Sequence, residues 1–338
     1  MTDTSNNSNT PYANLNPHLI LDAIENTGLL CSGSLLALNS YENRVYQVGI
    51  ENEAPLIAKF YRPNRWSNEA ILEEHQFAHE LMQHEIPVVA PMIIKEKTLH
   101  DFKNFRYALF PRRGGRPLEL DNLDQLAWMG RFIGRLHAVG ACQSFKNRSR
   151  LDAKTHGRDP FHFLIKHNFI PDFLKEKYIE TVTLLLNLID EAFLKAGVLD
   201  YIRLHGDCHA GNVLWNEVGP HIVDLDDSIM GPAIQDIWML LSGDRQQVNL
   251  QLSLILEGYR EFHDFNVREI YLIEALRALR LIQYSAWLAN RWNDPAFPLA
   301  FPWFNTAHYW QEQLQDLNDQ INSLMSAENE MINTLNCL

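Results

Sequence analysis

Cysteine is scarce in this 338-residue sequence, and the few cysteines stand far apart. There are four, at positions 31, 142, 208 and 337, and none belongs to a Cys-x-x-Cys pair. This scatter excludes a disulfide framework and favours reduced thiols in a cytoplasmic protein. Long hydrophobic runs are also lacking, since no stretch approaches 18 uninterrupted apolar residues, and the polar N-terminus has no apolar signal core. We therefore expect neither a membrane span nor membrane binding.

Basic residues are too few for a nucleic-acid protein. Lys plus Arg number 29 and Asp plus Glu 42, which gives a net charge of −13. Generic binding to nucleic acid or to anionic lipid needs a basic face, so both are excluded. A small phosphorylated ligand is not excluded, because charges more than about 8 Å away are largely screened at physiological salt. At roughly 150 residues per domain, the length predicts two units or one domain with two lobes.

The first third of the chain has the pattern of a small sheet with helices. Residues 1–16 are rich in Asn, Ser and Thr, and we expect a disordered tail there. Residues 17–112 form the predicted N-lobe, because short apolar or β-branched runs alternate with polar turns. The predicted strands are 34–38, 44–50, 56–61, 88–94 and 105–110, and the predicted helices are 19–26 and 67–85.

The remainder has mostly helical periodicity. Helices are predicted at 123–139, 172–196, 231–241, 250–263 and 267–291, with short apolar strands at 213–215 and 221–225. Residues 113–325 form the predicted helical C-lobe, with the catalytic and metal loops, and residues 326–338 a C-terminal tail. A small strand-rich lobe joined to a larger helical lobe predicts a ligand held in the cleft between them.

The most informative segment is residues 204–215, LHGDCHAGNVLW. Asp207 is followed five residues later by Asn212, just before a predicted strand, as in the catalytic loop of phosphoryl-transfer kinases. In that chemistry a carboxylate accepts the proton of the acceptor hydroxyl, and an amide oxygen holds a Mg²⁺ ion on the phosphates. The spacing therefore makes Asp207 a candidate catalytic residue and Asn212 a candidate metal ligand.

A second carboxylate follows a dozen residues later. Asp224 ends a predicted apolar strand, the position of a carboxylate that chelates Mg²⁺ between the β- and γ-phosphates. Mg²⁺ prefers hard oxygen ligands and keeps several waters, so one carboxylate and one amide suffice. Asp224 is therefore a candidate for both catalysis and metal binding.

Lys59 is the single lysine in a predicted apolar strand, LIAKF, similar to the lysine strand of kinases. Such a lysine needs a partner, and Glu74 shares the apolar face of the helix predicted at 67–85, whereas Glu73 points about 100° away. The loop at 38–46 occupies the position of a phosphate-covering loop but has no GxGxxG. Its cradle would use backbone N–H groups with Ser40 or Asn43.

Each feature alone has an ordinary structural explanation. A lone strand lysine is usually an edge residue, a His-Gly-Asp turn can be a helix cap, and a strand-ending aspartate is commonly a turn residue. Their joint occurrence in the order Lys, Glu, Asp, Asn, Asp, on the expected elements, favours a site for ATP and Mg²⁺.

These motifs resemble those of the aminoglycoside phosphotransferase-like kinases, which include choline and homoserine kinases. The HGDxHxxN form at 205–212 is typical of that family, as are GRLH at 134–137 and the segment 224–236. The resemblance implies an α+β, two-lobed, protein-kinase-like fold, with a small antiparallel-sheet N-lobe and a large, mainly helical C-lobe. We expect His137 and Asp236 to be structural, with Asp236 bonded to the backbone of the catalytic loop and His137 packed behind it.

A closer resemblance, over roughly residues 17–312, is to a bacterial branch of serine/threonine protein kinases of the stress response. It is carried by residues 38–48, 60–66, 71–78, 203–214 and 291–303. It implies that Asp207 is the proton acceptor and that Asn212 and Asp224 are Mg²⁺ ligands. It further implies that Ser40 and Lys59 belong to the ATP site and that Phe110 and the residues after it offer backbone contacts to adenine. We expect a monomer whose substrates are ATP and a protein.

Alternatives to a protein acceptor stay open. Only eleven residues separate Asp224 from Asp236, and no Ala-Pro-Glu motif follows, so the long activation segment that usually holds a peptide is missing. The spacing alone favours a small hydroxylated acceptor, as in aminoglycoside, choline or homoserine kinases, and a nucleotide-binding pseudokinase is a third possibility. The Pro- and aromatic-rich segment 292–304 is either a cap on the core or a wall on the acceptor side.

Overall fold

The computed structural model describes residues 11–335, and the side chains of residues 11–326. Contacts divide the chain into two units. The first unit contains the chain up to Leu118 together with Gly211–Asp226 and Asp294–Ala296; the second contains Glu119–Ala210, Asp227–Asn293 and the chain from Phe297 onward. This division differs from the predicted boundary at residues 112 and 113, because two distant segments join the first unit.

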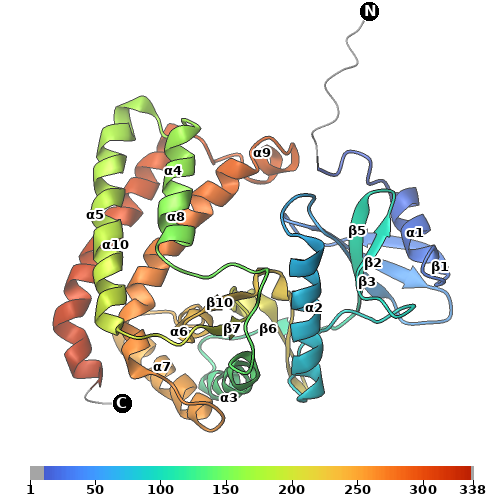
Figure 1. Ribbon diagram of the computed structural model, residues 1–338, viewed down its shortest axis with the longest axis horizontal. Helices are drawn as coiled ribbons and strands as arrows, with labels where there is room; N and C mark the ends of the chain where they lie inside the picture. Colours follow the sequence, from blue (N-terminus) through green and yellow to red (C-terminus); the bar gives the residue numbers. More distant parts are fainter. Residues whose placement is uncertain (1–10, 336–338) are drawn as a thin grey trace, which may run out of the picture. The chain divides into compact units, whose positions relative to one another are not determined.

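The first unit is built on a five-stranded antiparallel sheet in the order β1-β2-β3-β5-β4. Its strands are β1 (Cys31–Ala37), β2 (Arg44–Ile50), β3 (Leu56–Phe60), β4 (His100–Phe102) and β5 (Phe105–Pro111). Helices α1 (Pro17–Glu25) and α2 (Asn68–Gln83) flank the sheet (Figure 1). Each helix begins after a side chain that accepts a hydrogen bond from its first turn, Asn16 for α1 and Ser67 for α2.

The central strand β3 turns its side chains alternately toward these two helices. Phe60 lies in the core that contains Ile24 of α1. Because successive side chains of a strand point to opposite faces, Lys59 faces the other side. Its antiparallel neighbour Ala108 packs there with Ile71 of α2. The apolar pattern of β3 thus fixes a lysine on the α2 face of a central strand.

A second, three-stranded sheet of the first unit explains why its boundaries are discontinuous. It has the order β6-β8-β9, with β6 (Arg116–Pro117), β8 (Val213–Asn216) and β9 (Gly219–Ile222). The carbonyl oxygen of Ile222 accepts the N–H of Val89 at 2.9 Å, and the N–H of Ile222 donates to the carbonyl of Pro87 at 2.7 Å. Strand pairing between distant segments therefore brings the predicted metal loop into the first unit.

The second unit is mainly helical. Its helices are α3 (Leu123–Gly140), α4 (Asp159–Lys166), α5 (Asp172–Ala196), α6 (Ile234–Trp238), α7 (Arg245–Arg260), α8 (Ile273–Asn290), α9 (Ala296–Ala300), whose first residue belongs to the first unit, and α10 (Ala307–Leu335). The short strands β7 (Ile202–Leu204) and β10 (Ile229–Gly231) pair antiparallel. Helices α5, α8 and α10 pack along one another, and α3 packs on α7 (Figure 1). A small antiparallel sheet with a mainly helical remainder confirms the predicted α+β class.

Several predicted elements are wrong in detail. Residues 88–94 form isolated bridges rather than a strand, because Pro87 and Pro91 each lack an N–H donor at that place. The helix predicted at 231–241 is reduced to α6, since its start pairs as β10. The helix predicted at 267–291 begins with a 3-10 turn, Val267–Leu272, and is α-helical only as α8.

Parts of both predicted tails belong to the folded chain. The Tyr12 hydroxyl donates to the carbonyl oxygens of Glu42 and Phe60, at 3.2 Å each. Helix α10 continues to Leu335, and Leu324 is buried on it. The rest of the tails, residues 1–10 and 336–338 with Cys337, lies outside the described residues. Among residues 11–335, no helix is both long and apolar enough to cross a bilayer.

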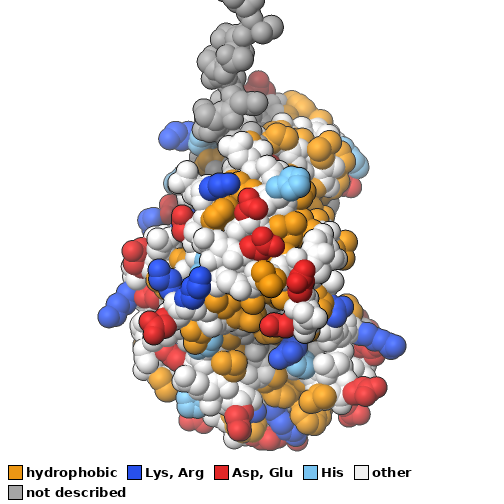
Figure 2. Space-filling view, turned by 90° about the vertical axis from the view of Figure 1, so that its right-hand side faces the viewer, with side chains coloured by type: hydrophobic (Ala, Val, Ile, Leu, Met, Phe, Trp, Pro, Cys, Tyr) orange, Lys and Arg blue, Asp and Glu red, His pale blue; other side chains and the backbone are white. Residues whose placement is uncertain are grey.

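Acidic and basic side chains are interspersed on the face shown in Figure 2. The net charge of −13 is therefore not gathered into one acidic area on that face. Since charges beyond a Debye length are screened, the local partners of each ionised group decide its behaviour.

The contact between α3 and α7 depends on glycine. A Cβ atom placed on Gly130 would lie 2.2 Å from the carbonyl oxygen of Ile255, and one on Gly134 would lie 2.5 Å from that of Tyr259. Both obstacles are backbone atoms of a neighbouring helix, which cannot rotate away. The two helices approach this closely only because these positions carry no side chain.

We expect Gly130→Ala to lower the free energy of unfolding by about 2 kcal/mol, because overpacking against a backbone outweighs the helix preference of alanine. Urea denaturation followed by circular dichroism measures the change. Gly114→Ala is the control, since a Cβ there meets nothing within 4 Å. Equal stability of the Gly130→Ala protein and the wild type would contradict the close approach of α3 and α7.

Candidate active site

Lys59 is a buried cation in the first unit. Its side chain is 7% exposed, and its Nζ lies 2.8 Å from Oδ1 of Asp224 and 3.4 Å from Oδ1 of Asp226. Burial disfavours the charged amine, but Asp224, Asp226 and Glu74 together outweigh it and hold the pKa of Lys59 well above its usual value. The lysine therefore stays protonated.

The predicted partner of Lys59 contributes as one of three carboxylates. Glu74 is buried on α2, the helix that the Lys59 face of β3 meets, whereas the neighbouring Glu73 is only half-buried. This agrees with the choice of Glu74 over Glu73 from helix periodicity. The direct ion pairs of Lys59 with Asp224 and Asp226 were not anticipated, because both aspartates are more than 160 residues away in sequence.

Three segments of the first unit contact the carboxylate of Asp226. Besides Lys59 of β3, it accepts a hydrogen bond from Nδ2 of Asn43 at 3.1 Å and pairs with Arg65, which precedes α2. Its side chain is 3% exposed. Sequence reasoning missed Asp226 and Arg65 as site residues. The available signal was a second aspartate two positions after Asp224, in DLDD.

The loop between β1 and β2 is held from several sides. The side-chain oxygen of Asn43 accepts the N–H of Arg62 at 3.1 Å. Arg62 pairs with Oε1 of Glu42 at 3.1 Å and with Oδ2 of Asp294 at 2.6 Å. The Ser40 hydroxyl donates to the carbonyl of Asn43 at 3.1 Å, which tightens the turn. The loop that the sequence suggested as a phosphate cover is thus anchored by ion pairs rather than by glycines.

Backbone pairing in the first unit links Asn212 to Val223, the residue before Asp224. Asn212 ends a 3-10 turn before β8, and its carbonyl accepts the N–H of Val223, next to Asp224, at 2.9 Å. The Asp224 side chain is 54% exposed, unlike that of Asp226. An exposed carboxylate and an amide oxygen are hard ligands, so this pair fits a Mg²⁺ ion that keeps its other ligands as phosphate and water.

Phe110 lies near the end of β5, opposite Ile57 of β3. Its ring packs against the cluster of Tyr61, Ile71 and Ala108, on the α2 side of the sheet. The Phe110 side chain is therefore part of the apolar packing on the α2 face of the sheet. The chain continues from β5 through Gly114 and Gly115 to β6.

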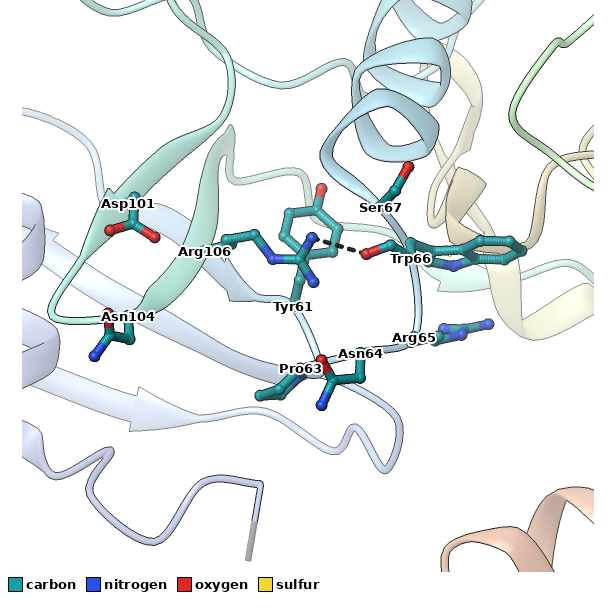
Figure 3. Close-up of a pocket in the computed structure, with 9 residues that line it drawn as sticks. All are labelled: Tyr61, Pro63, Asn64, Arg65, Trp66, Ser67, Asp101, Asn104 and Arg106. Atoms are coloured by element: carbon teal, nitrogen blue, oxygen red, sulfur yellow. Dashed lines mark hydrogen bonds between the residues drawn. The ribbon is translucent and has the colours of Figure 1, made fainter. Parts of the chain in front are cut away.

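An open hollow on the first unit has a different lining. It lies between the β3–α2 loop, residues 61–67, and the β4–β5 hairpin (Figure 3). Arg106 donates a hydrogen bond from Nη1 to the carbonyl of Trp66 at 2.8 Å. None of the predicted site residues lines this hollow. It shares only Arg65 with the network around Asp226.

The catalytic-loop segment in the second unit is fixed by a buried carboxylate. Asp236 of α6 accepts the backbone N–H groups of His205 and Gly206, at 2.8 Å each. His137 of α3 lies behind it, with Nε2 at 3.0 Å from Oδ2 of Asp236 and Nδ1 at 3.0 Å from the Tyr259 hydroxyl. The structural roles predicted for Asp236 and His137 are confirmed.

Gly206 is required where the loop turns. Its φ is +87°, a left-handed conformation, and a Cβ there would lie 2.1 Å from the carbonyl oxygen of Asp227. Both conditions exclude a side chain. The HGD motif therefore has a backbone reason for its glycine, and the turn presents Asp207 next in the chain.

Asp207 lies among positive groups of the second unit. Its Oδ1 is 2.8 Å from Nη1 of Arg280 on α8, and its Oδ2 is 3.5 Å from Nε2 of His209. Burial opposes ionisation, but the hydrogen bond from His209 and the charge of Arg280 outweigh it and hold the pKa of Asp207 well below its usual range. The carboxylate stays charged. Arg280 was missed from sequence, since its partner is 73 residues away.

The Pro- and aromatic-rich segment divides between the two units. Asp294 belongs to the first unit and is the buried partner of Arg62. Phe297 and Phe304 are buried in the second unit, and their rings pack on Trp287 and Trp292, respectively. Two larger apolar side chains of the segment are exposed, Leu299 at 84% and Trp303 at 43%. The aromatic residues mostly cap the core.

Glu269 forms a hydrogen bond with the backbone at the start of α6. It lies in the 3-10 turn before α8, and its Oε2 accepts the N–H of Ile234 at 2.9 Å. Burial raises the pKa of Glu269 to about 7, against the opposing hydrogen bonds from the backbone of α6. The helix that carries Asp236 therefore rests on a carboxyl group that titrates near neutral pH.

The sequence is similar to known kinases over nearly its whole length. The model of the phosphotransferase enzyme family matches residues 34–273. Stress response kinase A from Escherichia coli strain K12 is 44% identical over 315 residues, covering 93% of this chain and 95% of that protein. Serine/threonine protein kinase RdoA from Salmonella typhimurium is 44% identical over 309 residues, covering 91% and 93%.

Solved structures show the same fold at lower identity. Amicoumacin kinase hAmiN, in complex with AMP-PNP, Ca²⁺ and amicoumacin, has a TM-score of 0.67 and 21% identity, covering 89% of this chain and 92% of that one. Spectinomycin phosphotransferase APH(9)-Ia has a TM-score of 0.64 and 14% identity, covering 92% and 98%. The predicted two-lobed kinase-like fold is confirmed.

We expect Glu269→Gln to change how stability depends on pH. Between pH 4.5 and about 7 the folded protein keeps a proton on Glu269 that the unfolded chain has lost, so the free energy of unfolding falls as pH rises. At about 1.4 kcal/mol per pKa unit, this titration lowers the free energy of unfolding by about 3 kcal/mol between pH 4.5 and pH 7.5. The variant, measured by urea denaturation at pH 4.5 and 7.5, should lack this decrease. Parallel pH profiles of both proteins would contradict the pKa assignment.

Proposed function

We propose that this chain, which belongs to the phosphotransferase enzyme family, transfers the γ-phosphoryl group of ATP to a serine or threonine hydroxyl of a protein in a stress response. The observation that carries the nucleotide part is the buried, charged Lys59 beside the exposed carboxylate of Asp224. The names of relatives at 44% identity support the protein acceptor and the stress response. The free thiols of Cys31, Cys142 and Cys208 are consistent with the cytoplasmic location that we also propose.

The first unit supplies the groups for ATP and metal in this proposal. Lys59 would bind the phosphates as a permanent cation, kept in place by Asp226 and by Glu74. Asp224 and Asn212 would hold Mg²⁺, which neutralises the charge of the β- and γ-phosphates when bound. On nucleotide binding, the ammonium group of Lys59 would move away from the carboxylate of Asp224, because it would then contact phosphate oxygens.

The remaining nucleotide contacts come from two segments of the first unit. The loop that contains Ser40 and Asn43 would cover the phosphates with its backbone N–H groups, and its anchoring through Asp226 keeps it near Lys59. The backbone following Phe110 would meet the adenine. Both assignments follow the family resemblance, and the Ser40 hydroxyl is the weaker contact because it already bonds within its own turn.

Asp207 would act on the acceptor hydroxyl. Because its pKa is held well below its usual range, it is ionised throughout the physiological pH range and is a weak base. A weak base orients the hydroxyl by accepting its hydrogen bond and takes the proton late, which suits the loose transition state of phosphoryl transfer. We propose that a monomer performs the reaction, mainly by positioning and charge neutralisation.

A small hydroxylated acceptor is the second candidate. Between Asp224 and Asp236 the chain forms a 3-10 turn, the strand β10 and the start of α6, which leaves no room for an activation segment. Radiolabelled ATP, tested with casein and with a panel of amino alcohols, sugars and aminoglycosides, separates the two candidates. A pseudokinase would label neither, and the presence of Lys59, Asp207 and Asn212 argues against it.

We expect Asp207→Asn to bind ATP within about twofold of wild type and to lose transfer by about 10²- to 10⁴-fold, because only the proton acceptor is removed. Asp224→Asn should in addition weaken Mg²⁺-dependent ATP binding. Calorimetric titration with ATP, with and without Mg²⁺, and radiolabel transfer measure the two effects. Glu217→Gln, an exposed change in the β8–β9 turn, is the control. Transfer at the wild-type rate by Asp207→Asn would refute the assignment of the base.

A further inference from the structure

We propose that Arg280 is a positioning residue for phosphoryl transfer, which orients the carboxylate of Asp207. The inference rests on the proposed function, because it concerns the residue that would meet the acceptor hydroxyl. Arg280 lies on α8, outside the sequence motifs from which the site was predicted. Both residues lie in the second unit, so their contact does not depend on the placement of the first.

Arg280 contacts one oxygen of the Asp207 carboxylate directly. Nη1 of Arg280 lies 2.8 Å from Oδ1 of Asp207, while the imidazole of His209 lies 3.5 Å from Oδ2. A charge-assisted hydrogen bond of this length is directional and fixes the plane of the carboxylate. Since Oδ1 is held by the arginine, Oδ2 is the oxygen whose orientation toward a hydroxyl this contact sets.

The backbone of the loop is already fixed without Arg280. Asp236 binds the N–H groups of His205 and Gly206, before Asp207 in the chain. Those bonds determine where the backbone of Asp207 lies but leave its side-chain torsions undetermined. Beside His209, Arg280 constrains the side chain from α8, a helix anchored by buried residues such as Leu276 and Leu279. Its role is therefore distinct from the structural role of Asp236.

Arg280 also has the exposure expected of a residue at a working site. Its side chain is 47% exposed although it makes an ion pair, and Asp207 is 26% exposed. An exposed surface ion pair contributes little to stability, typically about 0–1 kcal/mol. Loss of the arginine should therefore affect the orientation of Asp207 more than the fold.

The same helix provides a matched control. Arg277 lies one turn before Arg280 on α8, with a side chain 30% exposed. It pairs with Glu274 of its own helix at 2.7 Å and lies over the ring of Trp238. Arg277→Gln removes a guanidinium from the same face without touching the catalytic loop.

The test compares Arg280→Gln, Arg280→Lys and Arg277→Gln with wild type. Steady-state transfer from radiolabelled ATP to casein, ATP binding by calorimetry and hydrogen exchange of the peptide covering residues 205–212 are measured. We expect Arg280→Gln to lower kcat by about 10- to 100-fold, with ATP affinity within about twofold, because misorientation of a reacting group has costs of that size. Arg280→Lys should recover part of kcat, and Arg277→Gln should stay within about threefold of wild type.

Exchange in residues 205–212 should be equal in Arg280→Gln and Arg277→Gln, because Asp236 and not Arg280 holds the backbone of the loop. Unchanged kcat in Arg280→Gln, equal kcat losses in both glutamine variants, or faster exchange in Arg280→Gln would overturn the inference. A wild-type protein that phosphorylates neither casein nor any hydroxylated small molecule contradicts the proposed function, and the inference with it. An active wild type whose kcat is matched by Arg280→Gln contradicts the inference alone, so the two failures are distinguishable.

Discussion

The buried charge of Lys59 is the constraint on which the first unit depends. An ammonium group taken out of water costs several kcal/mol unless carboxylates and hydrogen bonds compensate it. In this chain the compensation comes from Asp224 and Asp226, 165 and 167 residues further along. The pairing of β8 and β9 with β6, and the bonds of Ile222 to the segment after α2, deliver these aspartates to the lysine. The strand pairing that makes the boundary of the first unit discontinuous also provides the partners of this buried cation.

Compensating Lys59 creates a second requirement, because Asp226 is itself buried. Its carboxylate needs more donors than one lysine supplies, and Asn43 and Arg65 provide them. Asn43 in turn fixes the loop between β1 and β2, and Arg62 next to that loop needs Glu42 and Asp294. Asp226 thus connects Lys59 with the loop between β1 and β2 and with the residues before α2. The loop is anchored by hydrogen bonds and ion pairs in a sequence that has no glycine-rich loop at this place.

The candidate site residues that sequence analysis proposed are those with local patterns. Lys59 stands out in an apolar strand, Glu74 follows helix periodicity, and Asp207 and Asn212 share one loop. Asp226, Arg65 and Arg280 were missed because each acquires its role from a partner 73 or more residues away. Residues 88–94 were mistaken for a strand because apolar content was weighed above their flanking prolines. Periodicity indicated a strand-rich part followed by a helical part, and the family resemblance implied the fold class, whereas the division into units depends on strand pairing that no local window contains.

Cations lie beside the candidate site carboxylates although the chain as a whole is acidic. The chain carries a charge of −13, yet Asp224 and Asp226 share Lys59, and Asp207 has Arg280. At separations near 3 Å these pairs interact far more strongly than charges beyond the screening length of about 8 Å. The neighbouring cations therefore reduce the negative charge that these carboxylates present to their surroundings. An acidic chain can in this way hold carboxylates at fixed positions, because Asp224 and Asp226 share one lysine and Asp207 is paired with an arginine.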